Sequence, residues 1–185
     1  MNRSPVRLKR LKVVKTIHTG MDYTFRYTSP LGPLCMASDG QSLIGLWFEG
    51  QKHFGSTLSP IKKEAKLPLF TETIRWLSIY FDRKIPDFTP PLTMRSTPFR
   101  KRVFEILLTI PYGKTMTYGA IAKQIANEDK GGCMAAQAVG NAVGHNAISL
   151  IIPCHRVIGS KQKICGYAGG IERKLWLLAM EQGRL

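Results

Sequence analysis

Cys154 and His155 are the residues of this sequence best suited to do chemistry, because they stand side by side directly after a short apolar run. The run Ser149-Leu-Ile-Ile152 predicts a strand that delivers the cysteine to its end, and a turn-rich segment follows Arg156. A buried structural thiol is the commoner fate of a cysteine. The neighbouring polar residues favour the other interpretation, a partly exposed thiol near cations, which is the reactive kind.

Activation of this thiol has a definite energetic cost. A thiol of ordinary pKa, about 8.5, is only a few per cent ionised at neutral pH, and lowering that pKa by about two units requires about 2.7 kcal/mol of preferential thiolate stabilisation. A histidine that acts as a base and is oriented by a carboxylate delivers most of it, by the logic of a hydrolytic triad. We therefore take His155 as the candidate base, with Glu172 and Glu181, the nearest downstream carboxylates, as candidate orienting groups.

The surrounding residues resemble one known family. The run Ile152-Pro-Cys-His-Arg-Val-Ile158 is similar to the active-site signature of the O6-alkylguanine-DNA alkyltransferases, the methylated-DNA–protein-cysteine methyltransferases. The match spans residues 95 to 181, with a looser match from residue 22. Other runs that agree with the family in order and spacing are Pro111-Tyr-Gly-Lys-Thr-Met-Thr-Tyr-Gly119, Ala138-Val-Gly-Asn-Ala142, Asn146, Gly166-Tyr-Ala-Gly-Gly170 and Glu172-Arg-Lys-Leu-Trp-Leu-Leu178.

The resemblance implies a catalytic role for five residues. Cys154 is expected to accept the alkyl group, and His155 is expected to draw its proton through a bridging water while Glu181 fixes that histidine. Asn146 is expected to hold the turn that supports the active-site strand. Tyr118 is expected to contact the flipped guanine and to donate a proton as the alkyl group leaves.

The resemblance also implies how DNA is held. The backbones of Cys154, Val157 and Ala168 are expected to read the base edges, and the segment 166–170, which includes Tyr167 and Gly169, is expected to wall the pocket. The helix over residues 134–144 is expected to enter the minor groove, and the residues expected to bind DNA are Ala136, Gln137, Ala138 and Arg156. Many family members place an arginine at position 137 to fill the gap left by the extruded base. Glutamine is shorter and uncharged, so this departure concerns the stability of the flipped state and not the chemistry.

The function implied by the resemblance is direct reversal of DNA damage. A flipped O6-alkylguanine, with O4-alkylthymine left open as a second substrate, gives its alkyl group to Cys154 in a stoichiometric and irreversible transfer. The product is a thioether, which thiol exchange cannot reverse. We expect no cofactor and no metal, double-stranded DNA as the partner, and a monomer.

Two other classes of protein share some of these features. A thiol hydrolase also uses cysteine and histidine, but its histidine normally lies far from the cysteine in sequence. A DNA-binding module that only senses lesions shares every feature except the need for a thiol. A structural zinc site is disfavoured because the sequence has no Cys-x-x-Cys pair, and we expect four reduced thiols at Cys35, Cys133, Cys154 and Cys165.

The charge of the chain favours an anionic partner. The 185 residues hold 27 Lys and Arg against 12 Asp and Glu, a net charge of +15, and 44% hydrophobic residues, which is typical of a globular chain. Residues 1–20 hold six basic and no acidic residues, and residues 98–185 carry a net charge of +7. A folded basic surface excludes an acidic, ion-buffering protein and favours nucleic acid as the partner.

No run approaches the roughly 18 apolar residues that span a membrane, and the basic start lacks the apolar core of a signal peptide. We therefore expect an intracellular protein, cytoplasmic, or nuclear if the source is a eukaryote.

The elements that must position these residues fall into two halves of an α+β protein. Residues 23–28, 33–38 and 43–48 alternate with period two and predict a three-stranded antiparallel sheet, on which a helix over 71–82 packs. By the resemblance this unit, residues 1–88 with its basic N-terminal segment, is ribonuclease H-like. Pro86, Pro90 and Pro91 exclude a helix or a central strand and place an inter-domain linker at residues 89–97.

The second half, residues 98–185, is expected to be a mostly helical, winged helix-turn-helix-like domain that binds DNA and carries the alkyl acceptor. Thr97-Pro98 predicts a helix start, with an apolar stripe that runs to Ile110. A second helix follows Thr117 and stops before Gly131, and a third covers residues 134–144. The small residues of the third helix fit either tight packing against a neighbour or close approach to a minor groove.

Overall fold

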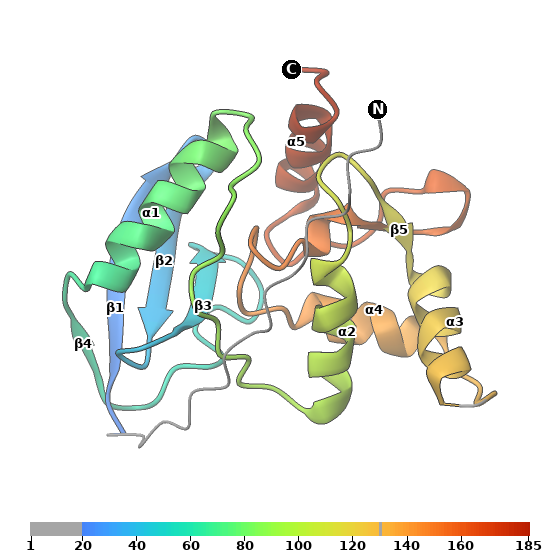
Figure 1. Ribbon diagram of the computed structural model, residues 1–185, viewed down its shortest axis with the longest axis horizontal. Helices are drawn as coiled ribbons and strands as arrows, with labels where there is room; N and C mark the ends of the chain where they lie inside the picture. The colour runs from blue at the N-terminus through green and yellow to red at the C-terminus, as the bar shows by residue number, and fades with distance from the viewer. Residues whose placement is uncertain (1–19, 130) are drawn as a thin grey trace.

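The computed structural model describes residues 20–129 and 131–185 (Figure 1). Its larger sheet has four strands, β1 (Asp22–Ser29), β2 (Gly32–Ser38), β3 (Leu43–Phe48) and β4 (Lys62–Glu64), in the order β3-β2-β1-β4. The pairs β1–β2 and β2–β3 are antiparallel, as predicted, whereas β4 lies parallel to β1. The expectation of a purely antiparallel sheet was therefore wrong. All three residues of β4 are exposed, so no alternation of apolar and polar residues marks this strand in the sequence.

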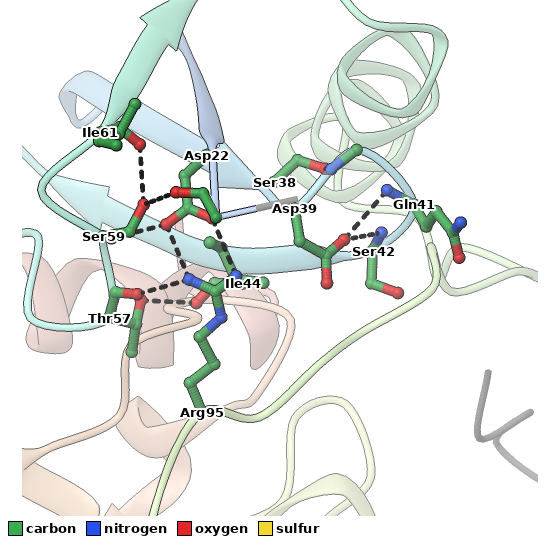
Figure 2. Close-up of polar contacts among 12 residues, drawn as sticks. Asp22, Ser38, Asp39, Gln41, Ser42, Ile44, Thr57, Ser59, Ile61 and Arg95 are labelled. Atoms are coloured by element: carbon green, nitrogen blue, oxygen red, sulfur yellow. Dashed lines mark hydrogen bonds and ion pairs between the residues drawn. The ribbon is translucent and has the colours of Figure 1, made fainter. Parts of the chain in front are cut away.

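Short turns set the register of this sheet. Gly32 and Gly40 have φ values of +102° and +98°, a left-handed conformation that glycine adopts without strain. In the second turn the Oδ1 atom of Asp39 accepts hydrogen bonds from the backbone N–H groups of Gln41 and Ser42, at 3.0 and 2.8 Å (Figure 2). The antiparallel meander follows from these two reversals.

Helix α1 (Pro68–Phe81) covers one face of the sheet (Figure 1). It begins three residues before the predicted start, because Pro68 occupies the first turn, where a missing N–H costs nothing. The side chains of Phe70, Leu77 and Tyr80 on this helix are buried. The ring of Phe70 stacks on Phe25 of β1, with 5.9 Å between the ring centroids. The C-terminal turn of α1 thereby carries Tyr80 into the interior.

The C-terminal half is mostly helical, which together with the sheet confirms the α+β class. Its helices are α2 (Pro98–Leu108), α3 (Tyr118–Glu128), α4 (Ala136–Gly144) and α5 (Ile171–Glu181). The hydroxyl groups of Thr97 and Thr117 cap α2 and α3 by accepting the N–H groups of Arg100 and Ala120. Helix α5 and a parallel pair of two-residue strands, β5 (Met116–Thr117) and β6 (Val157–Ile158), are additions to the prediction.

The predicted strand over residues 149–152 does not form. This segment is a series of turns in which Leu150 has a φ of +70°, and the chain then enters a 3-10 turn, η1 (Cys154–Arg156). A second such turn, η2 (Ser160–Gln162), follows β6. The three consecutive apolar residues Leu150, Ile151 and Ile152 are buried equally well in a turn as in a strand, and this explains the error.

The free edge of β3 joins the two halves. The N–H of Leu46 donates to the carbonyl of Ala147 and the N–H of Ser149 donates to the carbonyl of Leu46, both at 2.8 Å. The predicted linker lies along the same edge, with the N–H of Leu43 donating to the carbonyl of Pro91. Prolines are tolerated at such an edge. One cluster of buried side chains runs through both halves, so the division at residues 89–97 stays a prediction.

A buried ion pair fastens the end of this linker to the sheet (Figure 2). Arg95 donates to both carboxylate oxygens of Asp22, at 2.7 and 2.8 Å, and also to the carbonyl of Thr57 at 3.0 Å. The N–H of Ser59 donates to Asp22 as well, at 2.7 Å. Asp22 is only 1% exposed, so this carboxylate depends on its donors for solvation.

Candidate active site

Cys154 begins the turn η1 and its side chain is buried. Its Sγ atom accepts a hydrogen bond from Nδ2 of Asn146 at 3.0 Å. The same Nδ2 donates to the carbonyl of Ile152 at 2.8 Å, while Oδ1 of Asn146 accepts the N–H of Ile148 at 3.0 Å. Asn146 therefore holds together the turns that place the sulfur.

The environment of this thiol differs from the expected one. Cys154 is 3% exposed, not partly exposed, and burial raises the pKa of its thiol. The hydrogen bond from Asn146 and the positive charge of Lys174 lower the pKa of Cys154 without cancelling the effect of burial. The resting sulfur is therefore a neutral thiol, and a base inside the site must remove its proton for reaction to occur.

His155 and Glu181 meet at the C-terminal end of α5. Nε2 of His155 lies 2.8 Å from Oε1 of Glu181, and both side chains are fully buried. Burial lowers the pKa of His155, so its ring is a neutral imidazole at neutral pH. Burial alone would raise the pKa of Glu181, but hydrogen bonds from His155 and Arg156 outweigh it and hold this pKa far below its ordinary value.

This arrangement favours one position of the imidazole proton. An ionised carboxylate only accepts hydrogen bonds, so the contact with Glu181 favours the tautomer in which Nε2 of His155 carries the proton. Nδ1 then holds the free lone pair, and it has no hydrogen-bond partner among the described residues. His155 thus presents a buried, unprotonated nitrogen, as a general base requires.

Arg156 is turned inward, and this corrects its expected role as a DNA contact. Its Nε atom donates to Oε2 of Glu181 and its Nη2 to Oε1, both at 2.9 Å, while Nη1 donates to the carbonyl of Ile110 at 2.7 Å. Its side chain is 11% exposed. The guanidinium supplies the positive charge that keeps Glu181 ionised and is not free to contact a phosphate.

The wall of the pocket is built tightly. An added Cβ on Gly169 would lie 2.7 Å from the ring of Tyr167 and 3.0 Å from the ring of Phe48, so only glycine fits there. The hydroxyl of Tyr167 is buried, and burial raises its pKa. The carbonyl of Ala168 accepts the N–H of Lys52 at 3.1 Å, and its second lone pair remains for a base edge.

Beside this wall, an open groove of about 640 Å³ separates the N-terminus of α3 from α4. Ala136 and Gln137 line it and are exposed, whereas Ala138 is half-buried and points elsewhere. Cys154 does not line the groove. The residues that line it are Thr117, Tyr118, Gly119, Ala136, Gln137, Gly140, Asn141, Gly159 and Ser160.

Tyr118 lines the groove at the start of α3. Its hydroxyl donates to the carbonyl of Cys165 at 3.4 Å, a long hydrogen bond. Burial, with smaller effects from the thiols of Cys165 and Cys154, raises the pKa of Tyr118 to about 12. The phenol therefore holds its proton at neutral pH.

Comparison with known families identifies the chain. Residues 98–183 match the family model described as 6-O-methylguanine DNA methyltransferase, DNA binding domain. Residues 22–94 match the ribonuclease-like domain of the same methyltransferase. The chain belongs to the 6-O-methylguanine DNA methyltransferase family. The two matches cover both halves of the described structure and confirm the family resemblance found in the sequence.

Individual members of the 6-O-methylguanine DNA methyltransferase family align over most of the chain. The methylated-DNA--protein-cysteine methyltransferase of Mycobacterium tuberculosis (strain H37Rv) is 43% identical over 156 residues, which are 84% of this chain and 90% of the relative. The enzyme of that name from Haemophilus influenzae is 36% identical over 165 residues, 89% of this chain and 88% of the relative.

Solved structures of the family show the same fold. The crystal structure of M. tuberculosis O6-methylguanine methyltransferase is 41% identical, covers 89% of this chain and 95% of its own, and gives a TM-score of 0.74. The M. tuberculosis protein in complex with DNA is 40% identical, covers 89% of this chain and 94% of its own, and gives 0.71.

Lys174 is a residue of this methyltransferase-family site that the sequence prediction gave no role. It is fully buried on α5, and its Nζ atom donates to the carbonyls of Val157, Cys165 and Gly166 at 2.5, 2.8 and 3.1 Å. It thereby joins the backbone of Val157, an expected base-reading residue that is itself buried, to the pocket wall. A signal was present, because Lys174 lies three residues before Leu177 on the apolar face of α5.

Two properties of the described residues bear on other classes of function. Among residues 20–129 and 131–185, no three His, Cys, Asp or Glu side chains are placed to hold a metal ion. Within the same residues no helix has both the length and the apolar character needed to cross a membrane. The four cysteines, all inside the described part of the chain, are free thiols.

Proposed function

We propose that this protein repairs alkylated DNA directly, by moving the alkyl group of an O6-alkylguanine to the sulfur of Cys154. The observation that carries the proposal is the buried His155–Glu181 pair directly beside the thiol of Cys154 in the chain, in the same half of the chain as the groove between α3 and α4. A thiol next to an oriented base serves nucleophilic transfer, and a groove lined by small residues serves approach to a duplex.

The duplex is engaged through its minor groove. A minor groove is only about 6 Å wide, so the small residues Ala136 and Gly140, which line the groove of the protein, let the backbone of α4 come close. The target base is extruded toward Cys154 at a cost of a few kcal/mol, which is lower for a poorly paired lesion. Gln137 is exposed at the start of α4 and would take the place of the extruded base. Phosphate contacts would come from the basic surface of residues 98–185, which is indifferent to sequence.

The transfer removes one proton from the thiol and replaces the carbon–oxygen bond of the lesion with a carbon–sulfur bond. Nδ1 of His155 removes the thiol proton of Cys154 through a bridging water, and the sulfur attacks the alkyl carbon. The bond from that carbon to O6 breaks, its electron pair stays on the guanine, and Tyr118 supplies the proton that restores the neutral base. The proton held on His155 then returns to the Tyr118 phenolate.

The product limits each protein molecule to one reaction. A thioether at Cys154 cannot be reversed by thiol exchange, so the sulfur is not regenerated unless another activity removes the alkyl group. The protein is therefore consumed by its substrate and acts as a stoichiometric, monomeric reagent without a cofactor. It would work where cellular DNA is, in the cytoplasm, or in the nucleus of a eukaryote.

The decisive experiment follows a label. Incubation with a duplex that carries a tritiated O6-methylguanine should move the label to the peptide that contains Cys154, with at most one methyl per protein. Cys154→Ala should bind the duplex and take no label. Cys133→Ala, which removes an exposed thiol, is the matched control and should react as the wild type does. Label that stays on the DNA, appears on Cys133 or turns over repeatedly would refute the proposal.

A further inference from the structure

Tyr80, at the end of α1, reaches the reactive centre from the other half of the chain. Its side chain is 1% exposed, and its hydroxyl lies 2.7 Å from Oε1 of Glu181 and 3.3 Å from Nε2 of His155. The ring is fixed by Trp76, which stacks on it at 5.3 Å between centroids, and by the edges of Phe81 and Tyr112. The sequence prediction gave this residue no function.

We propose that Tyr80 is a positioning residue for alkyl transfer, which holds Glu181 and keeps the proton of His155 on Nε2. The inference rests on the proposed function, since it assigns a further residue to the same reaction. It also gives the ribonuclease-like half a direct part in the site, because α1 belongs to residues 22–94.

The distances decide the direction of the hydrogen bonds. The phenol has one proton, and the shorter distance and the negative charge both place that proton on the bond to Glu181. The oxygen of Tyr80 then faces Nε2 of His155 with its lone pairs. An imidazole with its proton on Nε2 satisfies both Glu181 and Tyr80, whereas an imidazole with its proton on Nδ1 would set the one lone pair of Nε2 against the lone pairs of two oxygens. The hydroxyl therefore favours the tautomer in which Nδ1 is the base.

The phenol itself does not take part in proton transfer. Burial, with the adjacent charge of Glu181, raises the pKa of Tyr80 well above its ordinary value. The group stays protonated throughout the pH range in which the protein folds. Its contribution is the placement of one donor and one acceptor, so removal of the hydroxyl alone should reveal it.

Tyr80→Phe removes the hydroxyl and keeps the ring. We expect the single-turnover rate of methyl transfer to fall roughly 10- to 100-fold, the effect of losing one hydrogen bond to a charged group. The dissociation constant for undamaged duplex should not change. Tyr112→Phe is the matched control, because the hydroxyl of Tyr112 is buried in the same cluster of rings but has no hydrogen-bond partner among the described residues. It should transfer at the wild-type rate.

A second measurement separates positioning from a merely structural role. The ¹⁵N chemical shifts of His155 report which ring nitrogen carries the proton, and they need no substrate. In the wild type we expect the proton on Nε2, and in Tyr80→Phe a mixture of both tautomers. A wild type protonated on Nδ1, or a Tyr80→Phe variant with the wild-type tautomer and the wild-type rate, would overturn the inference.

These readouts also keep the two proposals distinguishable. If the wild type transfers no methyl group, the proposed function fails while the ¹⁵N shifts still test the hydrogen-bond arrangement. If the wild type is active and Tyr80→Phe equals Tyr112→Phe in rate and tautomer, only the role of Tyr80 fails. Should Tyr80→Phe not fold, the wild-type tautomer alone decides, since a proton on Nδ1 contradicts the inference without any variant.

Discussion

Replacement of Glu181 by glutamine is expected to abolish most of the alkyl transfer while DNA binding is kept. Every neighbour of this carboxylate in the described structure is a donor, namely Tyr80, Gly113, His155 and Arg156. Glutamine offers one oxygen and one amide NH2 group, so its NH2 must face a donor in either orientation. The least costly escape is for His155 to move its proton to Nδ1 and accept from the amide. That tautomer has no lone pair directed at the thiol.

The size of the effect follows from this conflict. In the serine-protease triad, the wrong histidine tautomer produced by the equivalent amide costs about 10⁴-fold in rate, and we expect on the order of 10³-fold for Glu181→Gln. Loss of the buried charge also leaves Arg156 without its partner, and breaking such a pair costs about 3–5 kcal/mol. Because glutamine retains one acceptor, about 3 kcal/mol of the free energy of unfolding should be lost.

The assay is single-turnover transfer of a labelled methyl group from duplex DNA at saturating protein, with urea unfolding measured alongside. Glu172→Gln is the matched control, because Glu172 is exposed in the first turn of the same helix. Its removal should cost only a few tenths of a kcal/mol through the helix dipole and leave the rate unchanged. A Glu181→Gln rate within about threefold of the wild type would refute the assignment of His155 as an oriented base.

Three further outcomes are expected. Burial raises the pKa of Asp22, but the hydrogen bonds from Arg95 and Ser59 outweigh it and lower this pKa overall. The stability that Asp22 contributes is therefore complete above about pH 4 and is lost as the pH falls through the lowered pKa. Asp22→Asn should cost about 3 kcal/mol of the free energy of unfolding at pH 7 and progressively less below about pH 4, as measured by urea unfolding. Gln137→Arg adds one cation at the DNA face and should steepen the dependence of log Kobs on log salt by about 0.9. Lys174→Met removes the charged donor to the carbonyls of Val157, Cys165 and Gly166 and a charge that lowers the pKa of Cys154, so it should cost about 3 kcal/mol of stability and move the pH–rate profile for transfer to higher pH.

Each of these outcomes has a contrary result. An Asp22→Asn penalty that stays constant from pH 7 to acid would show that the carboxylate is not the titrating group. An unchanged salt slope for Gln137→Arg would place that side chain away from phosphates. For Lys174→Met, the control is Lys163→Met, an exposed lysine of the neighbouring segment. Equal pH–rate profiles for the two lysine variants would remove Lys174 from any effect on the thiol.

Sequence patterns predicted the elements whose signals are local. Period-two alternation predicted β1 to β3, and the caps at Thr97 and Thr117 placed the starts of α2 and α3. The misses are elements that depend on distant partners. β4 is a polar tripeptide held by β1. In the buried run before Cys154 the N–H of Ser149 bonds to Leu46 of β3, and those of Ile151 and Ile152 bond to carbonyls of residues 148 and 149.

The candidate site likewise has residues that local sequence patterns predicted and features that depend on distant parts of the chain. The adjacent Cys154 and His155, and the family resemblance around them, pointed to the reactive residues. The burial of the thiol, the inward turn of Arg156 and the contribution of Tyr80 depend on packing between segments far apart in the chain. Arg156 follows Cys154 and His155 in a run that reads as basic and exposed, and only the position of Glu181 in space shows where its charge is used.

The hydrogen bonds that orient His155 also have a consequence for how the protein folds. They join Tyr80 to Glu181 across 101 positions of sequence and Tyr80 to His155 across 75. Contacts between residues so far apart in sequence form late, because closing the intervening loop costs entropy before the contacts can stabilise the chain. Capped helices such as α2 and α3 form early, because their contacts join neighbouring residues. The order of assembly therefore leaves Cys154 without an oriented base until α1 and α5 have docked. A partly folded chain carries the nucleophile but not its oriented base, so alkyl transfer from O6-alkylguanine in DNA reports completed folding.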